Sequence, residues 1–397
     1  MGFGIGIHSL VLLALTLAPA SLANLIHTAS PVVDLRYARY QDVYKDTYDI
    51  KIFKGIRYAA PPIGKLRWQA PQPPSYRLGA FGFLSSEDVH KYGKTNAGLL
   101  DMRFALEWIQ EYITKFGGDP SRVTIGGESS GAGAVMLQAT AHGGKDDGLF
   151  NNIIAASPYT ATQFKYNDEV PNGALSRLCS TSGYASGNVS TSGAWGTWAF
   201  LPVTDGELIQ ELPSKQLPEK KVGGKRMMNN ANDGVPLSPP TTNTTAAFMQ
   251  YLKSTFPDFT PSDFAELLSI YKVASSSPES TGPPYDTLGN RDPTALNQSE
   301  FATGLQQTAF NIFAESDRRS REKSWKYQYS VTPAYHGADL TAYFSVGASV
   351  PNTNFRDVFQ RMLGNFIIND TPVISIADGK GGMANATVPE GTNGDID

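Results

Sequence analysis

The sequence of 397 residues contains a single cysteine, Cys179, so no disulfide can form within the chain. The segment around it, RLCSTSG, matches no known signature of a thiol enzyme. We therefore expect Cys179 to be half-buried and without a catalytic role. With one cysteine and five histidines, the chain also shows no spacing typical of a metal site. We expect neither a metal nor a cofactor.

The net charge of the chain is also small. The chain carries 33 lysines and arginines against 37 acidic residues, for a net charge of −4, and basic residues form no run. A broad positive field that could hold a phosphate backbone is therefore absent, which argues against nucleic acid as a partner. The length and the 41% hydrophobic content are ordinary for a globular protein with a sizeable core.

Long hydrophobic runs are missing as well. The apolar run from Leu10 to Ala18 is too short to span a bilayer, so we expect no integral membrane segment. A proline and small residues follow it, a pattern that predicts a signal peptide over residues 1–23 and a secreted, extracellular protein. Asn-x-Ser/Thr sequons fit an exported glycoprotein and lie at Asn188, Asn243, Asn297, Asn369 and Asn385.

What the sequence does contain is alternating helix and strand patterns. Apolar residues recur every three or four positions over 99–116, with charged residues such as Asp101 and Arg103 between them, which predicts an amphipathic helix. A short β-branched run at 122–125, a small-residue helix at 131–141 and an apolar strand at 149–158 follow. This alternation is typical of an α/β protein with a parallel sheet.

Later segments continue the alternation less clearly. Further helices are predicted at 242–256, 261–273 and 357–367, and a strand at 324–331. Residues 274–299 are rich in Ser, Pro and Gly and indicate a long loop, and residues 376–397 indicate a flexible tail. We expect one catalytic domain over residues 24–375.

The stretch Gly127-Glu128-Ser129-Ser130-Gly131 fits the pattern GxSxG, which is called the nucleophile elbow. In such an elbow the serine occupies a strained turn from strand to helix, and the glycines let both elements approach without Cβ clashes. The neighbouring patterns are a strand before and a small-residue helix after it, as this turn requires. We interpret Ser129 as a candidate nucleophile.

A serine hydroxyl needs a base, which in turn needs an acid to orient it. In hydrolases with this elbow the chain order is serine, acid, histidine. His8 leaves with the signal peptide, His27 and His90 precede Ser129, and His142 follows it too closely for an acid to intervene. His336, beside Gly337, is the candidate base.

The acid is not decided by spacing. Asp205 and Asp233 each precede a glycine at a turn between Ser129 and His336, and both remain candidates.

Several blocks resemble the type B carboxylesterase/lipase family, the cholinesterase-like α/β-hydrolases, and in particular its secreted fungal members. They follow the family's order over most of the chain and read FKGIRYAAPPIGKLRWQAPQPP (53–74), YRLGAFGFL (76–84), NAGLLDMRFALEWIQEYITKFGGDPSRVTIGGESSGAG (96–133), TWAFLPVTDG (197–206), NNANDG (229–234) and KYQYSVTPAYHGADL (326–340).

The resemblance implies an α/β-hydrolase fold, with a mostly parallel central sheet and helices on both faces. It also implies an ester substrate, either a small molecule or a lipid, and no cofactor. Ser129 would be the nucleophile, His336 the general base, and the backbone N–H of Ser130 an oxyanion donor. Asp233 would be the acid, where the family usually has Glu, and Asp205 becomes the second choice.

One family segment is missing between Pro74 and Tyr76, where only Ser75 stands. In the family this interval holds strands of the sheet, a disulfide-bonded loop and the HGGG-type stretch that supplies most oxyanion donors. The HGGK stretch at 142–145 follows the nucleophile helix and does not replace it. Each lost donor lowers the rate by about 10²–10³.

Two functions remain: a secreted serine ester hydrolase acting through an acyl-enzyme on Ser129, or an inactive or truncated homologue with a binding role or from a mis-assembled gene.

Overall fold

The computed structural model describes residues 32–46, 50–58, 61, 63–70, 76–159, 162–180, 199–216, 219, 225–230, 245–256, 258–270, 324–329, 331, 334–344 and 353–374. The predicted signal peptide and the predicted tail lie outside these residues, as do Ser75 and Asp233.

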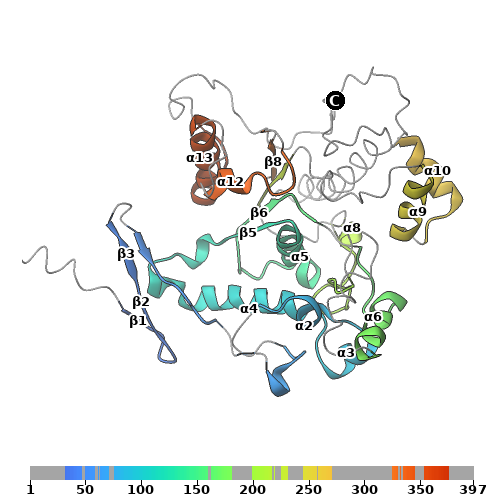
Figure 1. Cartoon of the computed structure of the whole chain (residues 1–397). Helices are drawn as coiled ribbons and strands as arrows, with labels where there is room; N and C mark the ends of the chain where they lie inside the picture. Colours follow the sequence, from blue (N-terminus) through green and yellow to red (C-terminus); the bar gives the residue numbers. More distant parts are fainter. Residues whose placement is uncertain are drawn as a thin grey trace, which may run out of the picture.

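A parallel sheet of four strands forms the centre of the described chain, in the order β5-β6-β7-β8 (Figure 1). The strands are β5 (Thr124–Glu128), β6 (Asn152–Ala156), β7 (Lys225–Asn230) and β8 (Ser324–Tyr329). The predictions of β5, β6 and β8 are confirmed, although each strand is shifted or shorter than its pattern. β7 was missed because its sequence, KRMMNN, is neither alternating nor apolar. Pairing with a strand on each side holds it in the sheet.

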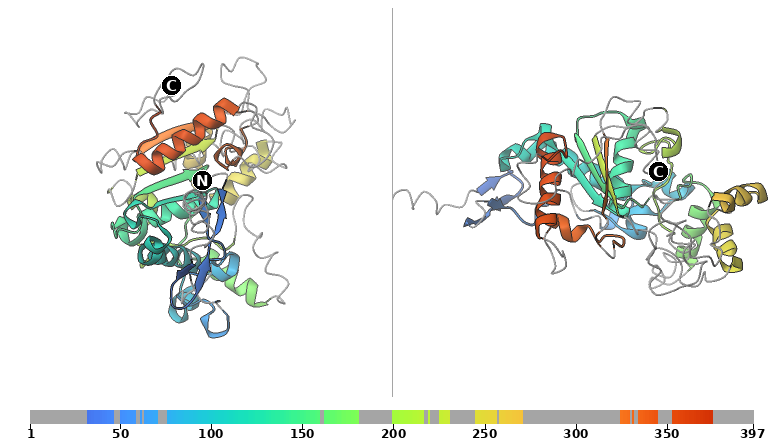
Figure 2. Two further views of the ribbon diagram at one scale, coloured as in Figure 1. Left: turned by 90° about the vertical axis from the view of Figure 1, so that its left-hand side faces the viewer. Right: turned by 90° about the horizontal axis from the view of Figure 1, so that it is seen from above.

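Helices cover both faces of this sheet, as the two views of Figure 2 show. On one face lie α4 (Ala97–Tyr112) and α5 (Ser130–Gly144), and on the other lie α12 (Leu340–Phe344) and α13 (Thr353–Asn369). The predicted helices at 99–116, 131–141 and 357–367 are therefore confirmed. The regular part of α5 ends before Ala141, where the backbone leaves the helical region.

The two faces of the sheet have separate cores. Ile153 and Ala155 on β6 face α5, while Ile154 between them faces the other side, as the two-residue period of a strand requires. The core between the sheet, α4 and α5 is built mainly from small and aliphatic side chains: Leu106, Ile125, Ala132, Val135, Met136, Ala139, Leu149, Ile153 and Ala155. The core beneath α12 and α13 is mainly aromatic: Trp325, Tyr327, Tyr329, Ala342, Phe359, Met362 and Phe366.

The remaining described elements surround this centre. Two hairpins precede α4, and the first packs with Trp108 of α4. They comprise β1 (Val32–Asp34), β2 (Arg39–Gln41), β3 (Val43–Lys45) and β4 (Ile50–Ile52). The other helices are α2 (Gly79–Phe83), α3 (Glu87–Tyr92), α6 (Glu169–Ser180), α8 (Pro213–Gln216), α9 (Thr245–Thr255) and α10 (Pro261–Ile270), with short 3-10 turns at Gly64–Leu66, Ile113–Phe116 and Pro120–Arg122. Both α9 and α10 were predicted.

Two side chains of α4 contradict the amphipathic pattern, since Asp101 and Arg103 are buried. The helix is covered on more than one side, by α5 and by α2. Each charge has an opposite partner, Arg77 for Asp101 and Asp147 for Arg103. A pattern of apolar spacing cannot reveal a charge that is buried because it is paired.

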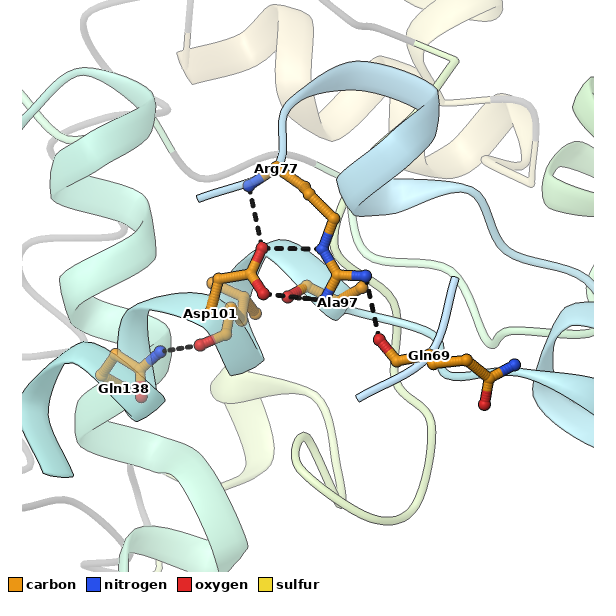
Figure 3. A network of polar contacts seen from close by, with 6 residues as sticks. Gln69, Arg77, Ala97, Asp101 and Gln138 are labelled. Atoms are coloured by element: carbon orange, nitrogen blue, oxygen red, sulfur yellow. Dashed lines mark hydrogen bonds and ion pairs between the residues drawn. The ribbon is translucent and has the colours of Figure 1, made fainter. Parts of the chain in front are cut away.

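The pair of Arg77 and Asp101 joins the segment after the predicted internal loss to α4 (Figure 3). The Arg77 backbone N–H and Nε donate to one Asp101 oxygen at 2.8 and 2.9 Å, and Nη2 donates to the other at 2.7 Å. Nη1 donates to the carbonyl of Gln69 at 2.9 Å, from the segment before the loss. One guanidinium therefore fastens both sides of this junction to the helix.

Cys179 is exposed on α6, so the prediction of a half-buried side chain is wrong. The buried positions of α6 are Pro171 and Ala174, and Cys179 lies off that face near the end of the helix. Among the described residues, no helix combines the length and apolar character that crossing a bilayer requires.

We predict that Arg77→Met lowers the free energy of unfolding by about 3–5 kcal/mol, because it leaves the Asp101 carboxylate buried without its cation. Urea denaturation measures the change. Lys94→Ala is the control, since its pair with Glu207 is 40% and 56% exposed, and it should cost less than about 1 kcal/mol. Equal effects of the two variants would contradict the anchoring role of Arg77.

Candidate active site

Ser129 sits in the strained turn that the elbow pattern predicts. It follows β5 and precedes α5, with φ 58° and ψ −121°, a backbone conformation that costs a non-glycine residue about 1–3 kcal/mol. The neighbouring strand stabilises it: the Ser129 N–H donates to the Ala156 carbonyl at 3.0 Å. Its own carbonyl accepts from the N–H groups of Gly133 and Tyr159, both at 3.0 Å. The turn is therefore fixed by β6 and α5 together.

Only one of the two elbow glycines is required by close packing. A Cβ at Gly127 would lie 2.2 Å from the backbone carbon and oxygen of Gly131, so β5 and α5 can meet only if residue 127 is glycine. A Cβ at Gly131 itself would meet nothing within 4 Å. Gly133, outside the pattern, is restricted instead, since its Cβ would lie 2.2 Å from the Tyr159 carbonyl.

His336 lies in a tight turn after β8. Gly337 has φ +76°, which confirms that the residue beside His336 needs the freedom of glycine, and the Ala338 N–H closes the turn onto the Tyr335 carbonyl at 2.9 Å. Because β5 and β8 are parallel strands of one sheet, Ser129 and His336 both follow strand ends at the same edge. The order of the strands thus unites two residues that are 207 positions apart in the sequence.

The described partner of the His336 imidazole is Glu128, the residue before Ser129. Its Oε1 lies 3.2 Å from His336 Nε2, and the side chains are 23% and 13% exposed. Among the described residues, no hydrogen bond joins the Ser129 hydroxyl to His336. From the sequence, Glu128 was predicted only as part of the elbow, and its contact with His336 was missed. The available signal was that a carboxylate ending β5 lies at the same sheet edge as the histidine after β8.

Asp205, the second candidate acid, has a structural role. One oxygen accepts from Asn96 Nδ2 at 2.7 Å and from Thr95 Oγ1 at 3.2 Å, and the other accepts from the N–H groups of Glu207 and Ile209, both at 3.0 Å. The carboxylate is buried, and four donors bind it to its own turn and to the start of α4. This leaves Asp233, which lies outside the described residues, as the candidate acid.

The other histidines of the described residues have different surroundings. The His90 ring stacks on Tyr166 with centroids 4.0 Å apart. His142 lies in the non-helical last part of α5 with φ 52°, and its N–H donates to the Leu208 carbonyl at 2.8 Å. The described part of the chain contains no group of three or more His, Cys, Asp or Glu side chains that could hold a metal ion.

Two half-buried tyrosines lie close to this site. Burial raises the pKa of Tyr159, which lies three residues beyond the end of β6, to about 12, and the nearby Tyr251 of α9 adds to the shift. Burial also raises the pKa of Tyr343 on α12 far above its usual value, with a further contribution from the negative charge of Glu128. Both phenols are therefore neutral at ordinary pH.

We predict that Gly127→Ala lowers the free energy of unfolding by at least about 2 kcal/mol, because the added methyl overlaps the backbone of α5. Gly131→Ala is the matched control. Its methyl enters open space, and alanine favours the helix, so stability should be unchanged or higher by up to about 1 kcal/mol. Thermal and urea unfolding compare the two, and a destabilised Gly131→Ala would contradict the packing described above.

Tyr159 should make the protein sensitive to alkali. Because burial raises its pKa from 10.0 to about 12, the folded state keeps the proton longer than the unfolded state, so its stabilising contribution is complete below about pH 10 and is lost as the pH approaches 12. By pH 11 the loss is about 1.4 kcal/mol. Urea unfolding at pH 8 and pH 11 should show this part of the decline in the wild type and not in Tyr159→Phe. Tyr92→Phe, at a side chain that is 69% exposed, should behave as the wild type.

Comparison with known sequences finds relatives of this chain. The profile of the Carboxylesterase family matches residues 30–75 and 74–195, two pieces that meet at the predicted internal loss. Carboxylesterase patB of Penicillium expansum is 30% identical over 325 residues, which are 75% of this chain and 55% of that protein. Secreted triacylglycerol lipase LIP1 of Gibberella zeae is 27% identical over 75% of this chain and 57% of that protein. The chain thus spans little more than half the length of these relatives.

Solved structures show the same fold. EstA of Aspergillus niger superposes with a TM-score of 0.72 at 23% identity, covering 87% of this chain and 90% of that one. A structure described as PNB esterase superposes with a TM-score of 0.68 at 18% identity, covering 87% of this chain and 92% of that one. At these identities the likeness concerns the fold alone. Together with the sequence matches, it identifies the chain as a shortened member of the carboxylesterase family with the α/β-hydrolase fold.

Proposed function

We propose that the protein is a secreted serine hydrolase that cleaves carboxylic esters through an acyl-enzyme on Ser129. Ser129 Oγ attacks the ester carbonyl while His336 accepts its proton, and the imidazolium then returns the proton to the departing alcohol. His336 next takes a proton from the water that attacks the acyl-enzyme, and it returns this proton to Ser129 Oγ as the acid departs. The backbone N–H of Ser130, the first residue of α5, donates to the developing oxyanion.

The observation that carries this proposal is the position of Ser129. A serine held at φ 58° between β5 and α5 projects from a turn that costs folding energy, and such strain is typical of functional sites. His336 follows β8 at the same edge of the sheet, and its imidazole lies against the residue directly before Ser129. In structures without substrate the bond between nucleophile and base is often long and shortens when substrate binds.

Glu128 has a defined part in this mechanism. Its carboxylate lies 3.2 Å from His336 Nε2, so its negative charge stabilises the imidazolium that forms when Ser129 loses its proton. Asp233 orients the imidazole as the third member of the triad. In the sequence, Asp233 comes three residues after β7. In the sheet, β7 lies between β6 and β8, and β8 is the strand that precedes His336. The four donors on Asp205 support this choice.

Substrate and location follow from relatives and sequence together. The relatives bear the names carboxylesterase, triacylglycerol lipase and secreted lipase, so we propose a small-molecule or lipid ester as substrate and an extracellular location. The pattern at residues 1–23 supports export. Asn369, one of the predicted glycosylation sites, is exposed at the end of α13 and can accept a glycan there.

A second candidate is an inactive homologue with a binding role. The observation that favours it is the short connection from Pro74 to Tyr76, where the family profile splits and where the family carries its oxyanion loop. With only the Ser130 donor, transition-state stabilisation falls by about 3–4 kcal/mol for each lost donor. The two candidates differ in one measurable property, turnover of an ester.

We predict that the purified protein hydrolyses a short-chain aryl ester and that Ser129→Ala lowers the rate at least about a thousandfold, because the nucleophile is lost. Ser176→Ala, at an exposed serine of α6, is the control and should keep the wild-type rate. A serine-directed phosphonate should label Ser129 and not Ser130, as peptide mapping would show. A folded protein, by circular dichroism, that neither hydrolyses ester nor takes the label would establish the inactive homologue instead.

A further inference from the structure

A chain of polar side chains crosses the aromatic core beneath His336. The Tyr327 hydroxyl, from β8, donates to Asp339 Oδ2 at 2.7 Å, and the hydroxyl of Tyr343 contacts that of Tyr327. Asp339 is fully buried, and Tyr327 is 7% exposed. A carboxylate without solvent is costly unless donors satisfy it, so Tyr327 stabilises the charge of Asp339.

Aromatic packing fixes where these hydroxyls point. The Tyr327 ring meets Phe359 edge to face with centroids 5.4 Å apart, and the Tyr343 ring lies 5.1 Å from the same Phe359. The rings of Tyr327 and Tyr343 are themselves edge to face at 6.4 Å. Neither phenol can turn away without breaking this core, so the hydrogen bond to Asp339 has a fixed direction.

Asp339 connects these polar side chains to the turn that carries His336. It lies three residues after His336, at the end of the turn, and its backbone carbonyl accepts from the N–H groups of Ala342 and Tyr343 at 2.9 and 3.0 Å, which starts α12. Its side chain binds β8 through Tyr327, so the turn is held at one end by the strand. On its other side the turn meets Glu128, with Oε1 at 3.2 Å from the position of a Cβ on Gly337.

We propose that Tyr327 and Asp339 are positioning residues for His336: their hydrogen bond holds the turn against β8 and thereby places the imidazole beside Glu128 and Ser129. The kinetic consequence rests on the proposed esterase function, while the structural consequence does not. Phenylalanine at position 327 would fill the same core without a hydroxyl to satisfy, so a polar chain at this place indicates a positional requirement.

Removal of the Tyr327 hydroxyl should act in two ways. The turn loses its tether to β8, and a displacement of about 1 Å at a catalytic group can cost about a hundredfold in rate. The buried Asp339 carboxylate also loses the Tyr327 donor, and the loss of a hydrogen bond to the charged form raises the pKa of the carboxyl group. The charged and titratable groups described around His336 are Glu128 from β5, Tyr327 from β8, and Asp339 and Tyr343 from its own turn and α12.

The first test is kinetic and compares two tyrosines of one strand. Tyr327→Phe should lower kcat/KM for an aryl ester by about tenfold to a hundredfold, mostly through kcat. Tyr329→Phe is the matched control: it lies two residues on, on the same face, is 2% exposed, and among the described residues its hydroxyl makes no hydrogen bond. It should retain activity within about twofold. Equal loss in both variants would overturn the proposal.

A second pair of variants separates position from stability. Asp339→Asn keeps an oxygen that accepts from Tyr327, while Asp339→Ala removes it. Asp339→Asn should therefore retain at least about tenfold more kcat/KM than Asp339→Ala, at protein concentrations corrected for the folded fraction. Identical kcat/KM values for the two folded variants would contradict a role for the hydrogen bond.

The third test does not depend on catalysis. NMR titration of the His336 ring, assigned with His336→Gln, should show its midpoint at lower pH in Tyr327→Phe than in the wild type, because a displaced turn moves the imidazole away from the Glu128 carboxylate, which favours the imidazolium. Tyr329→Phe should leave the midpoint unchanged. Coincident midpoints in all three proteins would overturn the proposal. If the wild type cleaves no ester but the midpoint shifts, the esterase function fails and the positioning role of Tyr327 stands.

Discussion

The close approach of β5 and α5 is the constraint on which the site depends. At Gly127 the strand meets the backbone of the helix so closely that any Cβ would overlap Gly131, and the chain must reverse between them within one residue. Ser129 is the residue at which the chain turns from strand to helix, and its φ is 58°. The cost of the strained backbone is offset by hydrogen bonds to β6 and by the aliphatic core beneath α5. The conformation of Ser129 is therefore a product of packing and not of loop flexibility.

Parallel strand order then brings distant residues to this serine. β8 begins almost two hundred residues after β5, yet both end at one edge of the sheet, and His336 comes seven residues after the end of β8. The polar contacts of the site also run through the sheet: Glu128 ends β5, and Tyr327 of β8 binds the turn that carries His336. Residues that lie far apart along the chain are thus held by one rigid sheet. This is how α/β proteins build accurate sites from distant segments.

Buried charge stabilises the rest of the scaffold beside the junction at the predicted internal loss. Arg77 joins Gln69 on one side of that junction to Asp101 of α4 on the other, and Asp205 secures the start of α4 through Asn96. These groups are buried and fully engaged, so they resist displacement more than surface ion pairs would. The shortened chain thereby keeps α4 and α5 in contact with the sheet, although it spans little more than half the length of its relatives.

The sequence by itself determined the elements with strong local patterns and the residues that the elbow and a count of histidines single out. Helix α4 and the turn at Ser129 were predictable because the apolar period and the positions of glycines are local properties. The turn at His336 was predictable because the sequence contains few histidines. Only the tertiary structure decided the features that depend on neighbouring segments. β7 forms because strands flank it, and Asp101 and Arg103 are buried because each meets an opposite charge. Asp205 is structural because four donors converge on it. The pairing of Glu128 with His336 belongs to the same class, since pattern and spacing describe one segment at a time, whereas a contact between two segments is set by how the sheet orders them.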